Sequence, residues 1–307
     1  MDDKAPIISI IIPTYKRLEK LRRLVASIMH SSFSSYEIIV INDDPIFGIT
    51  GELITDEINI TVINNHTNLG VNACRILGSK LAKGVIVFFI DDDNVLVNDT
   101  LINIYNAFNN SPSDAAVIAP ISYFLAEPKT VWWQGTTIRP ITLYSKFLFG
   151  NTGSNPMFII TEDVHNAFAV KRSYIKYLAL VDKRYRRAFP TVVFSKMLMK
   201  EGLGLYVASG CKIYHDIPVS RESNFDHFLA FIRSGRISCD RMYHYYYEPM
   251  LYAKQFNLGL RFFLNFFFQG IRSVLSIFII LINSRNYDIK LYTIMCIIKG
   301  LLEGVLS

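Results

Sequence analysis

Short apolar runs and helical stripes alternate along the first 120 residues of the chain. Runs rich in β-branched residues end in polar or turn residues, which is typical of strands buried on both faces of a sheet. These runs are residues 7–12, 36–41, 58–64, 85–90 and 115–119. Between them, apolar residues recur three and four positions apart over residues 17–30, 71–81 and 101–109, which predicts helices. Strands that alternate with helices predict an α/β fold with a mostly parallel sheet flanked by helices.

The run at residues 85–90 leads directly into Asp91, Asp92 and Asp93. The carboxyl end of a strand in an open α/β sheet is where such folds bind ligands. Three adjacent carboxylates repel one another unless a cation lies among them. Oxygen ligands two residues apart suit Mg²⁺ or Mn²⁺, which often bridge to substrate phosphates. The triplet therefore predicts a metal and diphosphate site, with a solvated acidic turn or a helix N-cap cluster as the alternative.

Two common nucleotide-binding motifs are absent from the sequence. No G-x-G-x-x-G follows the first predicted strand, and no Walker-type lysine loop occurs. The sequence therefore excludes a dinucleotide-binding fold and a P-loop enzyme. Thr14 and Asp43 do follow the first two predicted strands, as expected for a nucleotide site at the carboxyl edge of a sheet.

The composition of the chain indicates a membrane as a partner. Of the 307 residues, 51% are hydrophobic, the net charge is +6 and the pI is about 9.0. A basic chain suits nucleic acid or an anionic membrane face, but no Lys/Arg run or RNA-binding signature occurs, so no nucleic-acid partner is expected. The four cysteines are widely spaced without a C-x-x-C pair, and the polar N-terminus is not a signal peptide. These features favour a reducing, cytoplasmic compartment.

Four motifs occur in the order and at the spacing of glycosyltransferase family 2, a family of inverting enzymes with the GT-A fold, and the chain also resembles its rhamnosyltransferase-like members. They are I-I-S-I-I-I-P-T-Y-K-R at residues 7–17, E-I-I-V-I-N-D-D at 37–44, N-L-G-V-N-A-C-R at 68–75, and D-D-D at 91–93, which matches the D-x-D of the family. The resemblance is strongest over residues 7–105 and continues more weakly to about residue 215. Cys74 stands where the family has Ala, and Ile76 where it usually has Asn.

This resemblance implies a set of donor-site residues. Asp91 and Asp93 would hold Mn²⁺ or Mg²⁺ on the diphosphate of a nucleotide-sugar, and His215, at the end of a closing strand, would be a third metal ligand. The expected contacts of the nucleotide-sugar are Pro13, Thr14, Tyr15, Asp43, Arg75 and Asp91. The structural alternatives are a strand end at Thr14, a turn at Asp43, a surface helix position at Arg75 and a structural histidine at residue 215.

The general base does not match the family. An inverting displacement needs a base beside the acceptor hydroxyl, and the family supplies it from a Glu-Asp pair that falls here on Pro190-Thr191. Neither residue can act as a base. Asp163 precedes the acceptor-side strand at residues 166–172 and is the first substitute, with Asp182 and Glu201 as alternatives.

The C-terminal region changes in composition. Tyrosines cluster with basic residues near residue 245, which is typical of an interfacial segment. Residues 262–283 are mostly apolar but include Arg272, and their longest uncharged run, from residue 273 to 284, has 12 residues against about 20 for a spanning helix. An amphipathic stripe begins at Leu291. We therefore expect residues 255–307 to lie on a membrane surface, with a spanning segment within 262–283 as the alternative.

Together these observations predict a GT-A glycosyltransferase domain over residues 1–222, with a nucleotide-binding half (1–120) and an acceptor half (121–222). A membrane-associated helical region follows over 223–307. The predicted function is transfer of a sugar from a nucleotide-sugar to a glycan, polysaccharide or lipid-linked acceptor at the inner face of the cell membrane. An inactive nucleotide-sugar-binding protein is the alternative. A nucleotidyltransferase is disfavoured because residues 13–17 contain no glycine. Self-association is left open.

Overall fold

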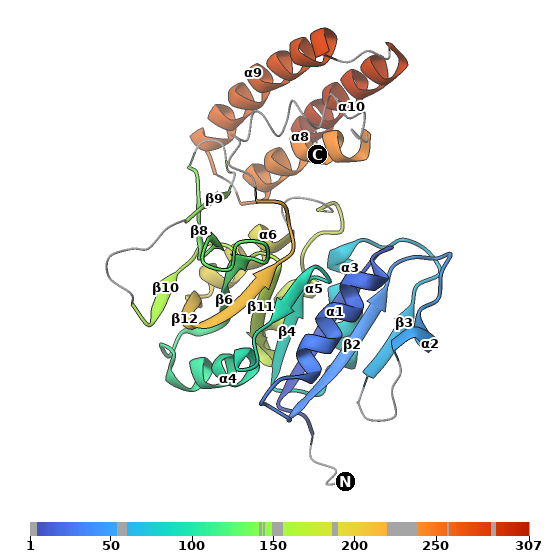
Figure 1. The fold of residues 1–307 in the computed structure, drawn as a ribbon. Coiled ribbons are helices and arrows are strands. Elements are labelled where there is room, and N and C mark those ends of the chain that lie inside the picture. Colours follow the sequence, from blue (N-terminus) through green and yellow to red (C-terminus); the bar gives the residue numbers. More distant parts are fainter. Residues whose placement is uncertain are drawn as a thin grey trace. The chain divides into compact units, whose positions relative to one another are not determined.

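The chain divides into two compact units, which are described separately (Figure 1). The computed structural model describes residues 5–53, 60–140, 143, 145–148, 156–185, 190–219, 239–256, 258–283 and 287–306. The first unit comprises Met1–Thr137, Phe147–Val181 and Phe194–Val219, and the second comprises Ile138–Lys146, Asp182–Val193 and Ser220–Ser307.

A mixed sheet forms the first unit, with the order β10-β12-β6-β11-β4-β1-β2-β3 among the described residues. Two short strands join it at the side, where β5 pairs with β12 and β7 pairs with β6. The strands are β1 (Ile8–Thr14), β2 (Tyr36–Asn42), β3 (Ile60–Asn64), β4 (Ile86–Ile90), β5 (Asn94–Leu96), β6 (Ala115–Phe124), β7 (Val131–Trp133), β10 (Phe158–Ile160), β11 (Ala167–Lys171) and β12 (Gly204–His215). The short strands β8 (Thr136–Ile138) and β9 (Ser145–Phe147) form a separate pair.

Among the described strands, one half of the sheet is wholly parallel, and the other half contains two reversed strands among its four. The strands β3, β2, β1 and β4 are parallel, as the alternating pattern predicts. β11 runs antiparallel to both β4 and β6, and β10 runs antiparallel to β12, but β6 and β12 pair in parallel and run in the same direction as β4. Along the main strand order the sheet is therefore mostly parallel, as expected, with β10 and β11 as the reversed strands. A parallel connection needs a crossover, usually a helix, and the described residues between β6 and β11 form only short strands.

Helices cover the sheet where the apolar stripes predict them. The helices of this unit are α1 (Leu18–Met29), α2 (Thr50–Leu53), α3 (Val71–Leu81), α4 (Thr100–Asn110), η1 (Arg172–Tyr174) and α5 (Ile175–Ala179). α6 (Pro190–Lys200) belongs to the first unit from Phe194 onward, and its first four residues are assigned to the second. α1 buries Leu21, Leu24, Val25 and Ile28 of its predicted stripe. All five residues of β4 are buried, which places this strand in the core as its uninterrupted apolar run predicts.

A close backbone approach at Gly84 fixes the start of β4 against β1. The Gly84 amide donates a hydrogen bond to Ser9 Oγ (2.8 Å), and a Cβ at this position would lie 2.7 Å from Ser9 N and 2.8 Å from Ile7 O. Both clashing atoms belong to the backbone of the central sheet, so they cannot rotate away.

We expect Gly84→Ala to lower the free energy of unfolding by about 3 kcal/mol, the upper end of the usual cost of overpacking. Urea unfolding followed by circular dichroism measures this difference. Gly210→Ala is the matched control, because a Cβ at Gly210 would meet no atom within 4 Å. Equal unfolding midpoints for the two variants would contradict the prediction.

The second unit contains the three C-terminal helices, α8 (Cys239–Gln255), α9 (Leu260–Asn283) and α10 (Tyr287–Leu306) (Figure 1). α10 packs closely on α8 through glycines, since a Cβ at Gly300 would lie 2.5 Å from Tyr243 O and one at Gly304 would lie 2.8 Å from Met250 Cβ. Cys296 is disulfide-bonded, whereas Cys74 and Cys211 are free. The wide spacing of the cysteines does not suggest a disulfide, and Cys296 differs from that expectation.

Among the described residues of α9, polar side chains are buried and large apolar side chains are exposed, the reverse of a helix on a water-soluble protein. Asn265, Gln269 and Ser273 follow one another at four-residue intervals on α9 and are all buried. The large apolar side chains Leu264, Phe267, Ile271, Val274 and Leu275 of α9, and Met295, Ile298 and Leu302 of α10, are instead exposed. None of the described helices combines the length and the apolar character needed to cross a membrane.

Candidate active site at the carboxyl edge of the central strands

The sequence-predicted donor residues meet at one edge of the first unit. β1, β2 and β4 are parallel, so their carboxyl ends, at Thr14, Asn42 and Ile90, lie side by side. β11 runs in the opposite direction, so the residue before it reaches the same edge, and the Asp91 amide donates a hydrogen bond to Asn166 O (2.8 Å).

Asp91 is paired with Arg75. Arg75 Nη2 donates to Asp91 Oδ1 (2.8 Å), and the guanidinium carbon lies 5.3 Å from the ring centre of Phe168. The Arg75 side chain is only 6% exposed, while that of Asp91 is 33% exposed. Arg75 is therefore a buried cation beside the Asp triplet and not a surface residue of α3.

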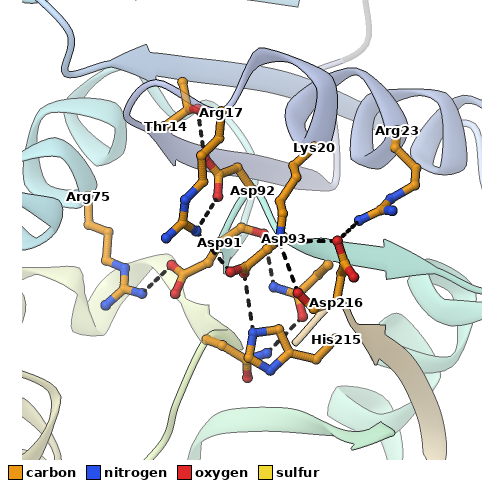
Figure 2. Close-up of polar contacts among 12 residues, drawn as sticks. Thr14, Arg17, Lys20, Arg23, Arg75, Asp91, Asp92, Asp93, His215 and Asp216 are labelled. Atoms are coloured by element: carbon orange, nitrogen blue, oxygen red, sulfur yellow. Dashed lines mark hydrogen bonds and ion pairs between the residues drawn. The ribbon is translucent and has the colours of Figure 1, made fainter. Parts of the chain in front are cut away.

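Asp92 turns toward β1 and holds the loop in place (Figure 2). Its carboxylate accepts hydrogen bonds from Thr14 Oγ1 (2.7 Å) and Arg17 Nη1 (3.1 Å). Burial raises the pKa of Asp92 despite these two partners. The middle carboxylate therefore ties the loop to β1 through Thr14 and shares Arg17 Nη1 with Asp93, so it contributes to the structure of the site.

Asp93 lies between Arg17 and His215 (Figure 2). Arg17 Nη1 donates to its Oδ2 (2.9 Å), and its Oδ1 lies 3.3 Å from His215 Nε2. Burial raises the pKa of Asp93, but the opposing effects of His215, Arg17 and Lys20 outweigh it, so the pKa lies below its ordinary value. The His215 ring packs edge-on against Trp132, with ring centres 4.3 Å apart.

A second ion-pair group supports the end of β12. The Asp216 amide donates to Asp93 O (2.8 Å), and the Asp216 carboxylate contacts Arg23 (2.6 Å) and Lys20 (3.1 Å) on α1. Arg23 and Lys20 lower the pKa of Asp216. These contacts fix β12 to α1 and thereby set the position of His215 relative to Asp93.

Two of the possible metal-ligating atoms, one from Asp93 and one from His215, lie at a spacing that suits a divalent cation, but no third ligand among the described residues joins them. Asp93 Oδ1 is buried and has no hydrogen-bond partner. Its 3.3 Å separation from His215 Nε2 is close to the roughly 3.0 Å that separates two adjacent ligands, each about 2.1 Å from an octahedral ion. Asp91 does not join them because it is turned toward Arg75. Within the described residues, no three His, Cys, Asp or Glu side chains converge as a complete metal site.

Asp43 anchors the loop before α3. Its carboxylate accepts hydrogen bonds from the amides of Leu69 and Gly70 (both 2.8 Å) and from Asn65 Nδ2 (2.9 Å). Gly70 has a positive φ of 84°, which glycine adopts without strain. These internal bonds use three of the four acceptor positions of the carboxylate. Of the other expected nucleotide contacts, Thr14 is buried and Tyr15 is 45% exposed.

Of the three candidate bases, Asp163 and the exposed Glu201 belong to the first unit and Asp182 to the second. Asp163 precedes β11 in the first unit, is fully buried, and accepts a hydrogen bond from Ser195 Oγ (3.3 Å). Asp182 lies in the second unit and is bound by Arg184 (2.7 Å), which lowers the pKa of Asp182. Pro190 and Thr191 begin α6, so no carboxylate occupies the expected position.

Several site residues escaped sequence reasoning. Arg17 and Lys20 stand on the polar side of a helical stripe, where a solvated face is the ordinary interpretation. His165 precedes the expected acceptor-side strand at residues 166–172, and the antiparallel pairing of Ala167 with Ile90 brings it opposite the Asp triplet. Only knowledge of that pairing could have identified it.

Comparison with known proteins gives one family and one fold. The model of the family described as glycosyl transferase family 2 matches residues 9–178, more than half of the chain. An uncharacterized glycosyltransferase of Haemophilus influenzae is 24% identical over 159 residues, which are 52% of this chain and 54% of that protein. The GalNAc(5)-diNAcBac-PP-undecaprenol beta-1,3-glucosyltransferase of Campylobacter jejuni is 32% identical over 100 residues, 31% of this chain and 32% of that protein.

The chain therefore spans about half or less of the length of these relatives. Among solved structures, GalNAc-T7 with UDP, GalNAc and Mn²⁺ superposes on this chain with a TM-score of 0.59 at 14% sequence identity. The superposition includes 84% of this chain and 53% of the GalNAc-T7 chain. At this identity the likeness establishes the fold alone, which is a mixed α/β fold of the GT-A type.

Proposed function

The chain belongs to glycosyltransferase family 2, and from that premise we propose that it transfers a sugar from a nucleotide-sugar donor to a hydroxyl of a glycan, polysaccharide or lipid-linked acceptor, with inversion at the anomeric carbon. The observation that carries this proposal is the buried Asp93 Oδ1, which has no hydrogen-bond partner among the described residues and lies 3.3 Å from His215 Nε2 at the carboxyl edge of β4. Such atoms suit the metal-bound diphosphate of a donor.

The structure gives more support for the stabilisation of the departing diphosphate than for the activation of the acceptor hydroxyl. Asp93 and His215 would hold Mn²⁺ or Mg²⁺ beside the diphosphate of the donor. GalNAc-T7, a structural neighbour, was crystallised with Mn²⁺. When bound, such an ion stabilises negative charge on the departing diphosphate. His215, followed by Arg17 and Lys20, outweighs the effect of burial and lowers the pKa of Asp93, and Arg75 holds the Asp91 carboxylate in place beside the same edge.

The nucleotide would lie beside the loop that Asp43 anchors. Three hydrogen bonds fix residues 65–70, and the fixed loop places Arg75 in the first turn and a half of α3 next to Asp91. Tyr15, half exposed at the end of β1, is available to stack on a base. Because GalNAc-T7 was crystallised with UDP, a UDP-sugar is the first donor to test.

The helical unit supports peripheral association with a membrane that contains a lipid-linked acceptor. Its exposed apolar residues and buried polar residues suit an apolar environment better than water. Residues 239–306 contain seven Lys/Arg and four Asp/Glu, a net charge of +3 that favours an anionic surface. The undecaprenol-linked substrate in the name of the Campylobacter jejuni relative is consistent with such an acceptor.

A thermal-shift screen of nucleotide-sugars, with and without Mn²⁺, tests the donor site. A donor at about one hundred times its Kd stabilises the folded state by about 2.7 kcal/mol, which corresponds to a rise in Tm of about 5–10 °C for a domain of this size. We expect this rise for one class of nucleotide-sugar in the presence of Mn²⁺. No shift with any donor would contradict the proposal.

The same screen separates an enzyme from an inactive binding protein, which is the second candidate because Pro190-Thr191 stands in place of the catalytic pair. An inactive protein would show the donor-dependent shift but neither transfer to an acceptor nor slow hydrolysis of the donor. An enzyme would show the shift together with release of the nucleoside diphosphate.

A further inference from the structure

His165 lies at the edge of the sheet where the reaction would take place. It precedes Asn166, whose carbonyl accepts the Asp91 amide and whose Nδ2 donates to Asn94 Oδ1 (2.7 Å). The His165 ring packs between aromatic residues, with its centre 4.6 Å from that of Phe147 and 6.0 Å from that of Trp133. The position of this imidazole is therefore set by both backbone pairing and ring packing.

Asp163 and His165 form a carboxylate–imidazole pair. Asp163 Oδ2 lies 3.4 Å from His165 Nε2, which is within ion-pair distance, although Nε2 is buried and makes no hydrogen bond to the described residues. Ser195 Oγ donates to the other carboxylate oxygen of Asp163 (3.3 Å). Asp163 is fully buried, so it cannot itself reach an acceptor hydroxyl, whereas the His165 side chain is 23% exposed. The exposed member of the pair is thus the imidazole, and the buried member lies behind it.

The surroundings keep His165 neutral and orient its proton. Burial, and secondly the charge of Arg75, lower the pKa of His165 to about 4. A carboxylate beside Nε2 favours the tautomer with the proton on that nitrogen, which leaves the lone pair of Nδ1 free to accept a proton. Carboxylates of ordinary pKa near 4 act as general bases in glycosyl chemistry, so an imidazole of similar basicity is sufficient.

We propose that His165 is the general base of the transfer and that Asp163 is the positioning residue that fixes its tautomer, a pair that replaces the carboxylates missing at residues 190–191. This inference rests on the proposed function. The acceptor oxygen forms a bond to the anomeric carbon as its proton passes to His165 Nδ1. The bond from the anomeric carbon to the diphosphate oxygen breaks, and its electron pair leaves with the nucleoside diphosphate. The imidazolium then loses its proton to water.

Substitution and rescue test the inference in the full-length protein. We expect His165→Ala and His165→Asn to lower kcat by about 10²–10⁴-fold, the usual contribution of a general base, with the donor-dependent thermal shift and the donor KM unchanged. Added imidazole should restore at least tenfold of the lost rate to His165→Ala, and more at a pH where free imidazole is neutral. A purely structural role would not respond to imidazole. His30→Ala, at the exposed end of α1, is the control.

Asp163→Asn tests the positioning role. We expect a fall in kcat with an intact donor shift, because the amide can present its NH₂ group to Nε2 and favour the wrong tautomer. Transfer by both His165 variants within threefold of the wild-type rate overturns the inference and leaves the proposed function standing. The inference is also overturned if the His165 variants change only the KM for the donor, or if added imidazole does not restore activity to His165→Ala. It is overturned as well if activity is lost only in Asp182→Asn. A wild-type protein that binds no nucleotide-sugar refutes the proposed function and this inference with it.

Discussion

Asp93→Asn is expected to lower the rate of sugar transfer by about 10³-fold, equivalent to about 4 kcal/mol of transition-state stabilisation. The amide keeps the size of the carboxylate but removes its charge. It therefore weakens any cation held by Asp93 and His215, and it leaves Arg17 with one carboxylate partner in place of two. The stabilisation of the departing diphosphate is lost, while the buried loop keeps its shape.

The measurement is release of nucleoside diphosphate with and without Mn²⁺, accompanied by the thermal shift with donor. Asp93→Asn should lose the Mn²⁺-dependent part of both signals. Asp114→Asn is a matched control, since Asp114 precedes β6 at the opposite edge of the sheet and bonds Tyr206 Oη. An Asp93→Asn protein with the wild-type rate would show that the leaving group is not stabilised at this carboxylate.

Local patterns in the sequence were sufficient for the elements that carry the donor site. The predicted helix over residues 71–81 coincides with α3, and the apolar run that ends at Ile90 coincides with the end of β4. These elements follow from periodicity and from turn residues at their ends, which depend only on neighbours along the chain. Because parallel strands share a carboxyl edge, the meeting of Thr14, Asp43 and Asp91 at one edge could be predicted as well.

The contacts that organise the site could not be predicted, because they join distant parts of the chain. Arg17 reaches Asp92 and Asp93 across more than seventy residues, and His215 reaches Asp93 across more than one hundred. The direction of β11 is another example. Its apolar run A-F-A-V reads like that of a parallel strand, and only the connection through short strands reverses it. Because β11 is reversed, His165, which precedes it, lies at the same edge of the sheet as the Asp triplet.

Burial and hydrogen bonding give two carboxylates, Asp43 and Asp163, roles in the structure that differ from those expected from the sequence. Asp43 reads as a nucleotide contact in the sequence, yet three hydrogen bonds show that it first orders the loop before α3. Its expected role toward the nucleotide stays a prediction. Asp163 reads as an accessible base, yet it is fully buried and the more exposed His165 lies beside it. In both cases the residue type indicated the correct region, and packing decided which atom faces a ligand.

The triple variant Phe267→Ser, Ile271→Ser, Val274→Ser is expected to abolish binding to lipid vesicles. These side chains are 64–67% exposed and share α9 with the buried Asn265, Gln269 and Ser273. Each apolar side chain of this size contributes about 1.5–3 kcal/mol when it leaves water. Three partly inserted residues therefore supply on the order of 5 kcal/mol, and their loss lowers the partition constant by more than 10³-fold.

Sedimentation with vesicles of equal parts phosphatidylcholine and phosphatidylglycerol measures the binding, and vesicles of phosphatidylcholine alone should bind less because the helical unit carries a net charge of +3. The matched control is Met157→Ser, Ile160→Ser, Leu180→Ser, which removes apolar side chains of similar exposure from the first unit. It should bind as the wild type does. Equal binding by both triple variants would refute a lipid-facing α9. So would a wild-type dimer that fails to bind vesicles and that the α9 variant converts to a monomer, because a second copy of the chain would then cover this surface.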